Sequence, residues 1–201
     1  MIEAIIMKVS GIVGSPKKKG NVDLLVTQAL NGAKSRGAKT QKIYLNNLNI
    51  KPCQSCGVDP RPEFCIYKDD MKIVYDILES SDVIVLGSPV YFDTVSAQTK
   101  LMIDRCNCLT PYVKDELGKY DFEKRLDRSK KGVFVAVAGI EQEFNTILTS
   151  IRGFFEWANI ELVDVILYAH DDYELGGVGK DKKRMEEAFK IGIRAIENES
   201  D

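Results

Sequence analysis

The chain has 201 residues, of which 44% are hydrophobic and 29% charged, and this ordinary mix excludes a disordered or fibrous protein. Its 28 Lys and Arg residues nearly balance its 30 Asp and Glu residues, so the net charge of -2 provides no electrostatic reason to bind nucleic acid or an anionic membrane. Five cysteines, an odd number, do not suit a secreted disulfide framework, and no apolar run reaches about 18 residues, so we expect one cytoplasmic domain over residues 1–201.

Short β-rich runs alternate with longer helical patterns along the chain. Strands are predicted over residues 7–13, 42–45, 83–87, 132–139 and 160–167, and helices over residues 21–37, 71–78, 95–105, 144–158 and 180–198. Asp181 stands where the last helix needs an N-cap, and residues 106–131 are expected to form an insertion or an irregular helix. The alternation predicts a doubly wound α/β domain, in which ligands bind beyond the carboxyl ends of the parallel strands.

The turn after the first strand is the first candidate binding feature. It reads Gly14-Ser15-Pro16-Lys17-Lys18-Lys19-Gly20-Asn21, directly before the first predicted helix. A helix start presents unpaired backbone N–H groups and a partial positive charge that bind phosphate, and Ser15 and Lys17 add a hydroxyl and a cation. The alternative is a solvated, lysine-rich turn that only caps the helix, because the turn matches neither common nucleotide-binding glycine pattern.

The segment after the third strand is the second candidate feature. It reads Gly87-Ser88-Pro89-Val90-Tyr91-Phe92-Asp93-Thr94. The adjacent Tyr91 and Phe92 suit a platform for a flat ring, although aromatic side chains more often pack as core. Ala138 and Gly139, at the end of the fourth strand, are a weaker signal at the same edge. Together these features suit a ligand with a phosphate at one end and a planar ring at the other.

These motifs resemble a known family. With Ser96-Ala97-Gln98-x-Lys100-x-x-x-Asp104-Arg105, they look like the flavodoxin-like NAD(P)H-dependent FMN reductases, and more closely like their iron–sulfur flavoprotein branch. The resemblance covers roughly the first half of the chain at the level of motifs. It implies a flavodoxin-like three-layer sandwich, with a five-stranded parallel sheet in the order 2-1-3-4-5 and helices on both faces.

The resemblance also implies an FMN site and an oxidoreductase activity. The flavin would take hydride from NAD(P)H and pass electrons to a small acceptor, with no catalytic side chain required. Family members associate as dimers or tetramers. The implied phosphate contacts are Ser15, Lys17, Asn21 and Val22, and the implied ring contacts are Pro89, Val90, Tyr91 and Phe92, with Ala138 and Gly139 closing the other side.

A cysteine loop after the second strand departs from that branch. The branch carries four cysteines there, whereas this chain has Cys53, Cys56 and Cys65, with Asp59 at the third position. An iron–sulfur cluster normally needs four thiolates, and Asp59 replaces a soft ligand by a hard one beside the competing cation Arg61. We therefore favour no cluster. Two alternatives stay open: an iron–sulfur cluster or a zinc ion held by these four side chains. If a cluster is present, the protein would be an electron carrier.

Two further functions are alternatives to the reductase. One is a flavin-binding module without catalytic activity, and the other is a hydrolase of a phosphate ligand. Cys106 and Cys108 are interpreted as packing residues, and His170 as structural or peripheral to the ligand site. The segment Gly176-Gly177-x-Gly179 resembles a phosphate loop, but it lacks a preceding strand in the right place.

Overall fold

The computed structural model describes residues 6–126, 130–139, 143–171 and 174–197. Its main sheet holds five parallel strands in the spatial order β2-β1-β3-β7-β8. Numbered along the chain, these five strands lie in the order 2-1-3-4-5, which confirms the predicted topology. The strands are β1 (Lys8–Val13), β2 (Lys39–Tyr44), β3 (Val83–Tyr91), β7 (Lys130–Gly139) and β8 (Ile160–His170).

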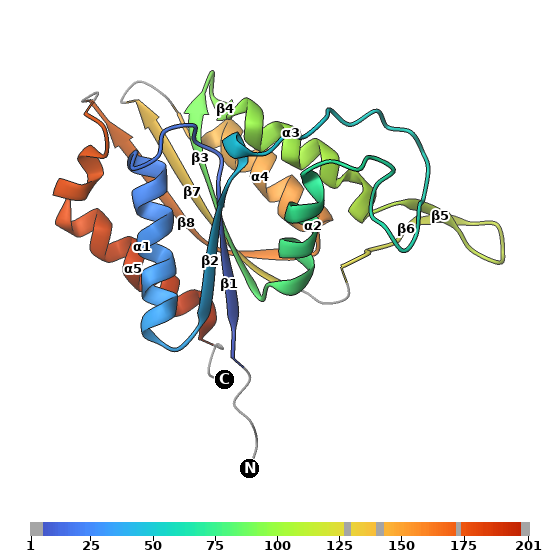
Figure 1. The fold of residues 1–201 in the computed structure, drawn as a ribbon, viewed down its shortest axis with the longest axis horizontal. Coiled ribbons are helices and arrows are strands. Elements are labelled where there is room, and N and C mark those ends of the chain that lie inside the picture. The colour runs from blue at the N-terminus through green and yellow to red at the C-terminus, as the bar shows by residue number, and fades with distance from the viewer. Residues whose placement is uncertain (1–5, 127–129, 140–142, 172–173, 198–201) are drawn as a thin grey trace, which may run out of the picture.

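Helices cover both faces of this sheet, as Figure 1 shows. Helices α1 (Asn21–Ser35) and α5 (Lys182–Ile196) pack on one face. The other face is covered by α2 (Met71–Ser80), α3 (Ala97–Arg105) and α4 (Asn145–Trp157). Each face has its own apolar core, one against α1 and α5 and the other against α2, α3 and α4. The central strands are buried on both sides, which explains their unbroken apolar runs.

The third strand is longer than predicted. It continues past Gly87 to Tyr91, because it pairs with β7 as far as Pro89 and then with the short antiparallel strand β4 (Thr94–Val95) through Val90. Most of the segment expected to be a ring-binding loop therefore belongs to β3. The turn proper consists of Phe92 and Asp93, whose φ values of 49° and 61° are left-handed.

Other boundaries shift for local reasons. The helix expected from residue 95 begins at Ala97, because Ser96 caps it by accepting a hydrogen bond from the Thr99 N–H. Asp181 caps α5 as predicted, accepting from the Arg184 N–H at 3.0 Å, while the expected helix end at Asn198 lies outside the described residues. The described residues also include three short 3-10 helices: η1 (Leu45–Asn47), η2 (Cys106–Leu109) and η3 (Gly177–Lys180).

The stretch expected to be an insertion or an irregular helix contains a β-hairpin. After η2, strands β5 (Tyr112–Lys114) and β6 (Tyr120–Phe122) pair antiparallel and project from the side of the fold opposite α1 and α5 (Figure 1). Within the described ranges, we find no helix with the length and apolar character needed to cross a membrane.

Candidate functional site

A cavity of about 570 Å³ opens at the carboxyl ends of β1, β3, β7 and β8, beside the start of α1. The structure brings nine of the ten flavin-contact candidates into its wall, and only Phe92 is missing. The nine are Ser15, Lys17, Asn21, Val22, Pro89, Val90, Tyr91, Ala138 and Gly139. Segments that are more than 120 residues apart along the chain therefore form one surface, at the sheet edge where such folds bind ligands.

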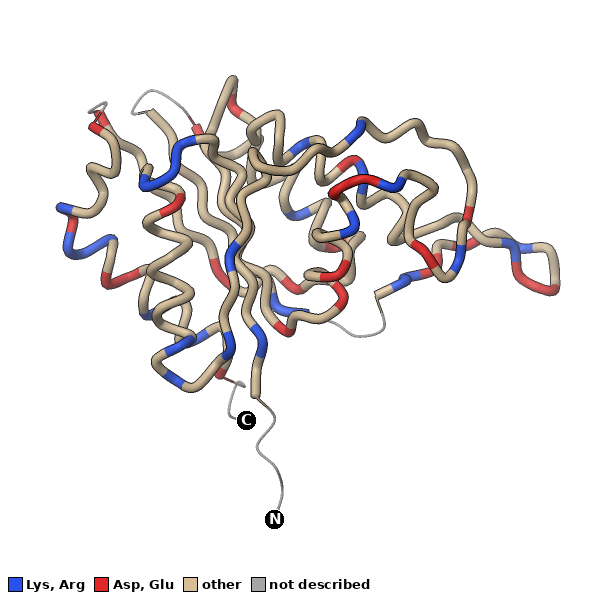
Figure 2. Tube along the Cα trace, viewed as in Figure 1, with Lys and Arg blue, Asp and Glu red and all other residues tan. Residues whose placement is uncertain are grey.

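One end of the cavity has the features of an anion site. Helix α1 begins at Asn21, and its N-cap residue Gly20 provides no side-chain cap, so the first-turn N–H groups face outward for a ligand. Ser15 is buried and accepts a hydrogen bond from the Lys17 N–H at 3.2 Å. Figure 2 shows the lysines of this turn as a basic segment just before α1. The residues present suit a phosphate.

Asp23, in the first turn of α1, would oppose an anion if its carboxylate were unpaired. Instead the carboxylate accepts hydrogen bonds from Lys42 Nζ at 2.6 Å, from the Lys19 N–H at 2.7 Å and from the Tyr44 hydroxyl at 3.0 Å. Burial raises the pKa of Asp23, but the bonds from Lys42, Lys19 and Tyr44 outweigh it, so the pKa lies below its ordinary value. The negative charge is therefore compensated inside the fold.

The other end of the cavity is lined by apolar residues. Val90 and Ala138 are almost fully buried, and Tyr91 is 44% exposed at the rim. This end is held rigidly, because Ser88 Oγ donates to the Pro89 carbonyl and accepts from the Ser96 N–H, each at 2.9 Å. The ends of the neighbouring strands β3 and β7 line this end of the cavity, and their apolar residues suit a planar ring.

Phe92 does not line the cavity. Its side chain is 97% exposed at the left-handed turn between β3 and β4, so it does not pack as core. The reason is the tight hairpin, which directs Tyr91 toward the rim and Phe92 into solvent. Phe92 is therefore the one candidate absent from the cavity lining, and its contact with a flavin stays a prediction.

Residues after β8 form a wall that the sequence motifs did not identify. His170, Asp171, Leu175 and Gly176 line the cavity, with Glu174 beside them. From the sequence, His170 is interpreted as structural or peripheral to the ligand site, although its position at the end of the fifth predicted strand is a signal for this edge of the sheet. The Gly176 segment is considered there only as a phosphate loop of its own.

The cysteine loop lies elsewhere, between η1 and α2. Cys53 and Cys65 are half-buried and Cys56 is exposed, and all five cysteines are free thiols. Asp59 pairs with Arg61 Nε at 2.7 Å and with Arg125 at 3.7 Å. In the described part of the chain, which includes all four candidate ligands, no three His, Cys, Asp or Glu residues come together as a metal site. As they lie, these side chains do not fit a cluster, and its absence stays a prediction.

Two arginines hold the cysteine loop in shape. Arg105 is fully buried and donates to Asp69 at 2.6 Å, to the Lys51 carbonyl at 2.8 Å and to Cys65 Sγ at 3.4 Å. Arg125 donates to the carbonyls of residues 62, 63 and 64 at 3.0–3.4 Å. Burial raises the pKa of Asp69, but the hydrogen bonds from Arg105 and the Lys51 N–H leave it below its ordinary value.

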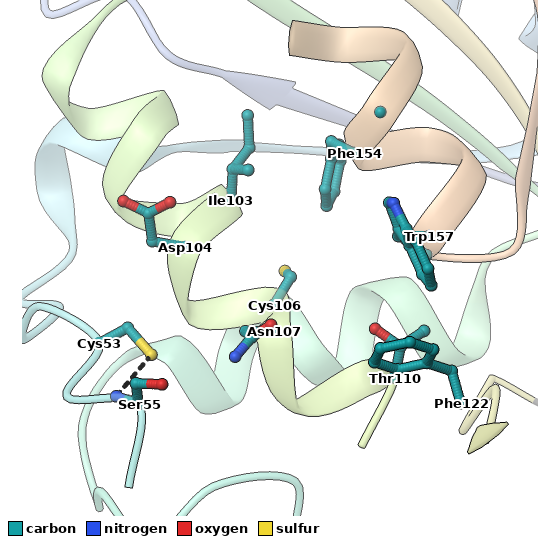
Figure 3. Close-up of a pocket in the computed structure, with 12 residues that line it drawn as sticks. Cys53, Ser55, Ile103, Asp104, Cys106, Asn107, Thr110, Phe122, Phe154 and Trp157 are labelled. Carbon is teal, nitrogen blue, oxygen red and sulfur yellow. Dashed lines mark hydrogen bonds between the residues drawn. The ribbon is translucent and has the colours of Figure 1, made fainter. Parts of the chain in front are cut away.

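A second cavity, of about 580 Å³, lies between the cysteine loop, η2 and α4. Figure 3 shows Phe154 and Trp157 on one side of it, with Cys53 and Ser55 on the other. Cys106 is buried beside it, and burial raises the pKa of its thiol well above the ordinary value. Cys108 packs against the Tyr75 hydroxyl at 3.2 Å. Both thiols are therefore packing residues, as interpreted from the sequence.

The fold has solved counterparts. A flavone reductase superposes with a TM-score of 0.72 at 20% identity, over 94% of this chain and 62% of its own. An archaeal flavodoxin superposes with a TM-score of 0.56 at 16% identity, over 94% of this chain and 96% of its own. At such identities the likeness shows the fold alone, which is flavodoxin-like.

Sequence relatives are closer. An iron–sulfur flavoprotein of Methanosarcina thermophila is 37% identical over 99 residues, which are 49% of this chain and 52% of the relative. One from Methanocaldococcus jannaschii is 34% identical over 151 residues, 74% of this chain and 71% of the relative. The chain spans only about half the length of the first curated relatives it matches. The family model for NADPH-dependent FMN reductases matches residues 7–170, so the chain belongs to that family.

Proposed function

We propose that the cavity at the carboxyl ends of the strands binds FMN, and that the protein is an NAD(P)H-dependent oxidoreductase that passes electrons to a small acceptor. The observation that carries the proposal is the cavity itself. It joins a helix start suited to an anion to an apolar lining within about 570 Å³. Membership of the FMN reductase family supports the same assignment.

Residues at different positions in the cavity would bind different parts of FMN. The first-turn N–H groups of α1, the Ser15 hydroxyl and the Lys17 ammonium would hold the phosphate. Pro89, Val90 and Tyr91 would bind one side of the ring, and Ala138 and Gly139 the other. Bound FMN supplies the hydride and electron transfer chemistry, while these residues bind it, orient it and keep its phosphate compensated.

The test begins with a visible absorption spectrum of protein purified without oxygen. Two flavin bands, or their appearance after FMN is added and the protein is passed through a gel-filtration column, are the expected result. NADH and NADPH oxidation is then measured with quinones, dyes and free flavin as acceptors. Protein that stays colourless after FMN addition overturns the proposal. Flavin binding without nicotinamide oxidation identifies a binding module instead.

The names of the relatives favour a second candidate function, electron transfer through an iron–sulfur cluster. The curated relatives quoted above are iron–sulfur flavoproteins. In this chain the cluster would need Asp59 as its fourth ligand, but Asp59 is paired with Arg61 and Arg125. We therefore place this function second. A broad, reducible absorption beneath the flavin bands, together with iron and sulfide, would reverse the order.

We also propose that residues 1–201 act as one domain and that copies of the chain associate as dimers or tetramers in the cytoplasm. Five unpaired thiols support the cytoplasmic location. A contiguous cluster of half-exposed aromatic side chains supports association, since such patches mark interaction sites. This aromatic cluster consists of Tyr112, Tyr120, Phe122 and Trp157, with ring centroids 4.8–5.1 Å apart in successive pairs.

A further inference from the structure

We propose that the turn Glu174–Lys180, called here the glycine turn, positions the phosphate end of the cavity. It does so by setting the orientation of the Asn21 amide and the course of the backbone at Lys19. This inference rests on the proposed binding of FMN and adds to it. The glycine motif in this turn is then a wall of the first-strand phosphate site and not a separate phosphate loop.

The first observation concerns the Asn21 side chain. Its Oδ1 accepts a hydrogen bond from the Val178 N–H at 3.0 Å, in a buried position. A backbone N–H can only donate, so the amide atom that faces it must be the oxygen. With the oxygen held there, the Nδ2 group is presented as a donor at the cavity wall, where Asn21 lies. A donor suits a phosphate, whereas an acceptor would repel it.

The second observation concerns Gly176. Its φ is +74°, and a Cβ atom there would lie 2.5 Å from the Lys19 carbonyl oxygen and 3.0 Å from Leu24 Cδ1. The glycine turn therefore touches the backbone of the lysine turn so closely that only glycine fits. The Lys19 N–H is held from its other side by Asp23 Oδ2 at 2.7 Å. Displacing Lys19 would thus displace the start of α1.

The glycine turn is itself well anchored. Val178 is fully buried in the core against α1 and α5. Backbone hydrogen bonds join Gly179 N–H to the Gly176 carbonyl and Asp181 N–H to the Val178 carbonyl, each at 2.9 Å. Because α5 follows directly, the Val178 N–H occupies a position set by the packing of that helix. The turn can therefore hold the Asn21 amide in one orientation.

The test compares the affinities of FMN and riboflavin, since riboflavin lacks only the phosphate. In Gly176→Ala, FMN affinity should fall by about tenfold or more while riboflavin affinity stays within about twofold. Gly179→Ala is the matched control, because its Cβ would meet only Leu24 Cδ1 at an ordinary 3.5 Å. It should leave both affinities within about twofold of the wild type.

A second variant keeps the test valid if Gly176→Ala does not fold. Asn21→Asp retains an oxygen for the Val178 N–H but replaces the Nδ2 donor by a carboxylate oxygen. FMN affinity should fall by about a hundredfold, with riboflavin affinity unchanged, because the new charge faces the phosphate.

The outcomes separate this inference from the proposed function. A wild-type protein that binds neither FMN nor riboflavin overturns the proposed function. A wild-type protein that binds both equally well leaves flavin binding standing but overturns the phosphate site, and with it this inference. A wild-type preference for FMN that survives in both variants overturns the role of the glycine turn and leaves the phosphate site standing. An equal loss of both ligands in folded Gly176→Ala also overturns it, because the turn would then serve the fold alone.

Discussion

At the scale of single residues, Ser15 and Asn21 are the uncharged side chains proposed to donate to a phosphate at the start of α1. Replacing both by Ala should weaken FMN binding by about 0.5–1.5 kcal/mol for each neutral hydrogen bond and up to about 3 kcal/mol for a charge-assisted one. Titration of flavin fluorescence on folded protein measures this. Asn31→Ala, an exposed change near the other end of α1, is the control. Unchanged FMN affinity in the double variant would refute the phosphate site.

Asp23 carries a pH-dependent part of the stability. Its folded-state pKa is lowered, so its pairing with Lys42 stabilises the fold above the ordinary Asp pKa of about 4 and is lost as the pH falls through the lowered value. Asp23→Asn should reduce the free energy of unfolding by about 1–3 kcal/mol at neutral pH, because it leaves Lys42 unpaired.

Urea unfolding of wild type and variant from pH 7 to pH 3 checks this expectation. The difference between the two should shrink toward the acid end. The control is Asp76→Asn, which breaks the exposed pair with Lys72 and should cost less than about 0.5 kcal/mol. A difference that stays constant over the whole pH range would contradict the assignment.

At the scale of elements, the cysteine loop has the spacing of a cluster motif, and hydrogen bonds from Arg105 and Arg125 hold its backbone. We expect protein reconstituted with ferrous iron and sulfide to retain less than about one iron per chain, because a four-thiolate set is missing. Asp59→Cys restores the fourth thiol and removes one of the two carboxylates that pair with Arg61, so its iron content should rise. Iron and sulfide analysis measures both. About four iron atoms per wild-type chain would establish Asp59 as a ligand.

Arg125 should matter for the order of this loop and not for flavin. Arg125→Ala removes hydrogen bonds to three loop carbonyls and the stacking of the guanidinium over Phe64 at 4.6 Å. Limited proteolysis within residues 52–66 should become several-fold faster while FMN affinity stays unchanged. Arg152→Ala, an exposed arginine on α4, is the control. Equal cleavage in both variants would show that metal or another contact orders the loop.

At the scale of the whole molecule, the aromatic cluster on the β5–β6 hairpin and α4 should drive self-association. Replacing Tyr112 and Trp157 by Ser should shift sedimentation equilibrium toward the monomer, because half-exposed aromatics contribute strongly to interfaces. Ile73→Ser, at an exposed apolar residue of α2, is the control. An oligomer that is unchanged in the double variant would place the interface elsewhere.

Local patterns predicted much of this molecule because they act over short stretches of chain. Apolar runs at β3 and β7 indicated strands buried on both faces, and Asp181 marked the start of α5. The order of the five strands came from the family resemblance and not from the runs themselves. The hairpin was missed because each strand has only three residues, too short for an alternating pattern.

What the sequence determined by itself was the kind of fold, the place of the cavity at the strand ends and most of its wall. The tertiary structure alone decided which distant residues meet there. Asn21 Oδ1 accepts a hydrogen bond from the Val178 N–H, 157 positions away along the chain. Asp59 forms an ion pair with Arg125 and does not join the cysteines. Phe92 points into solvent because it lies in the turn of a hairpin with two paired residues on each side. Such contacts depend on how whole elements pack, and no short segment of the chain contains that information.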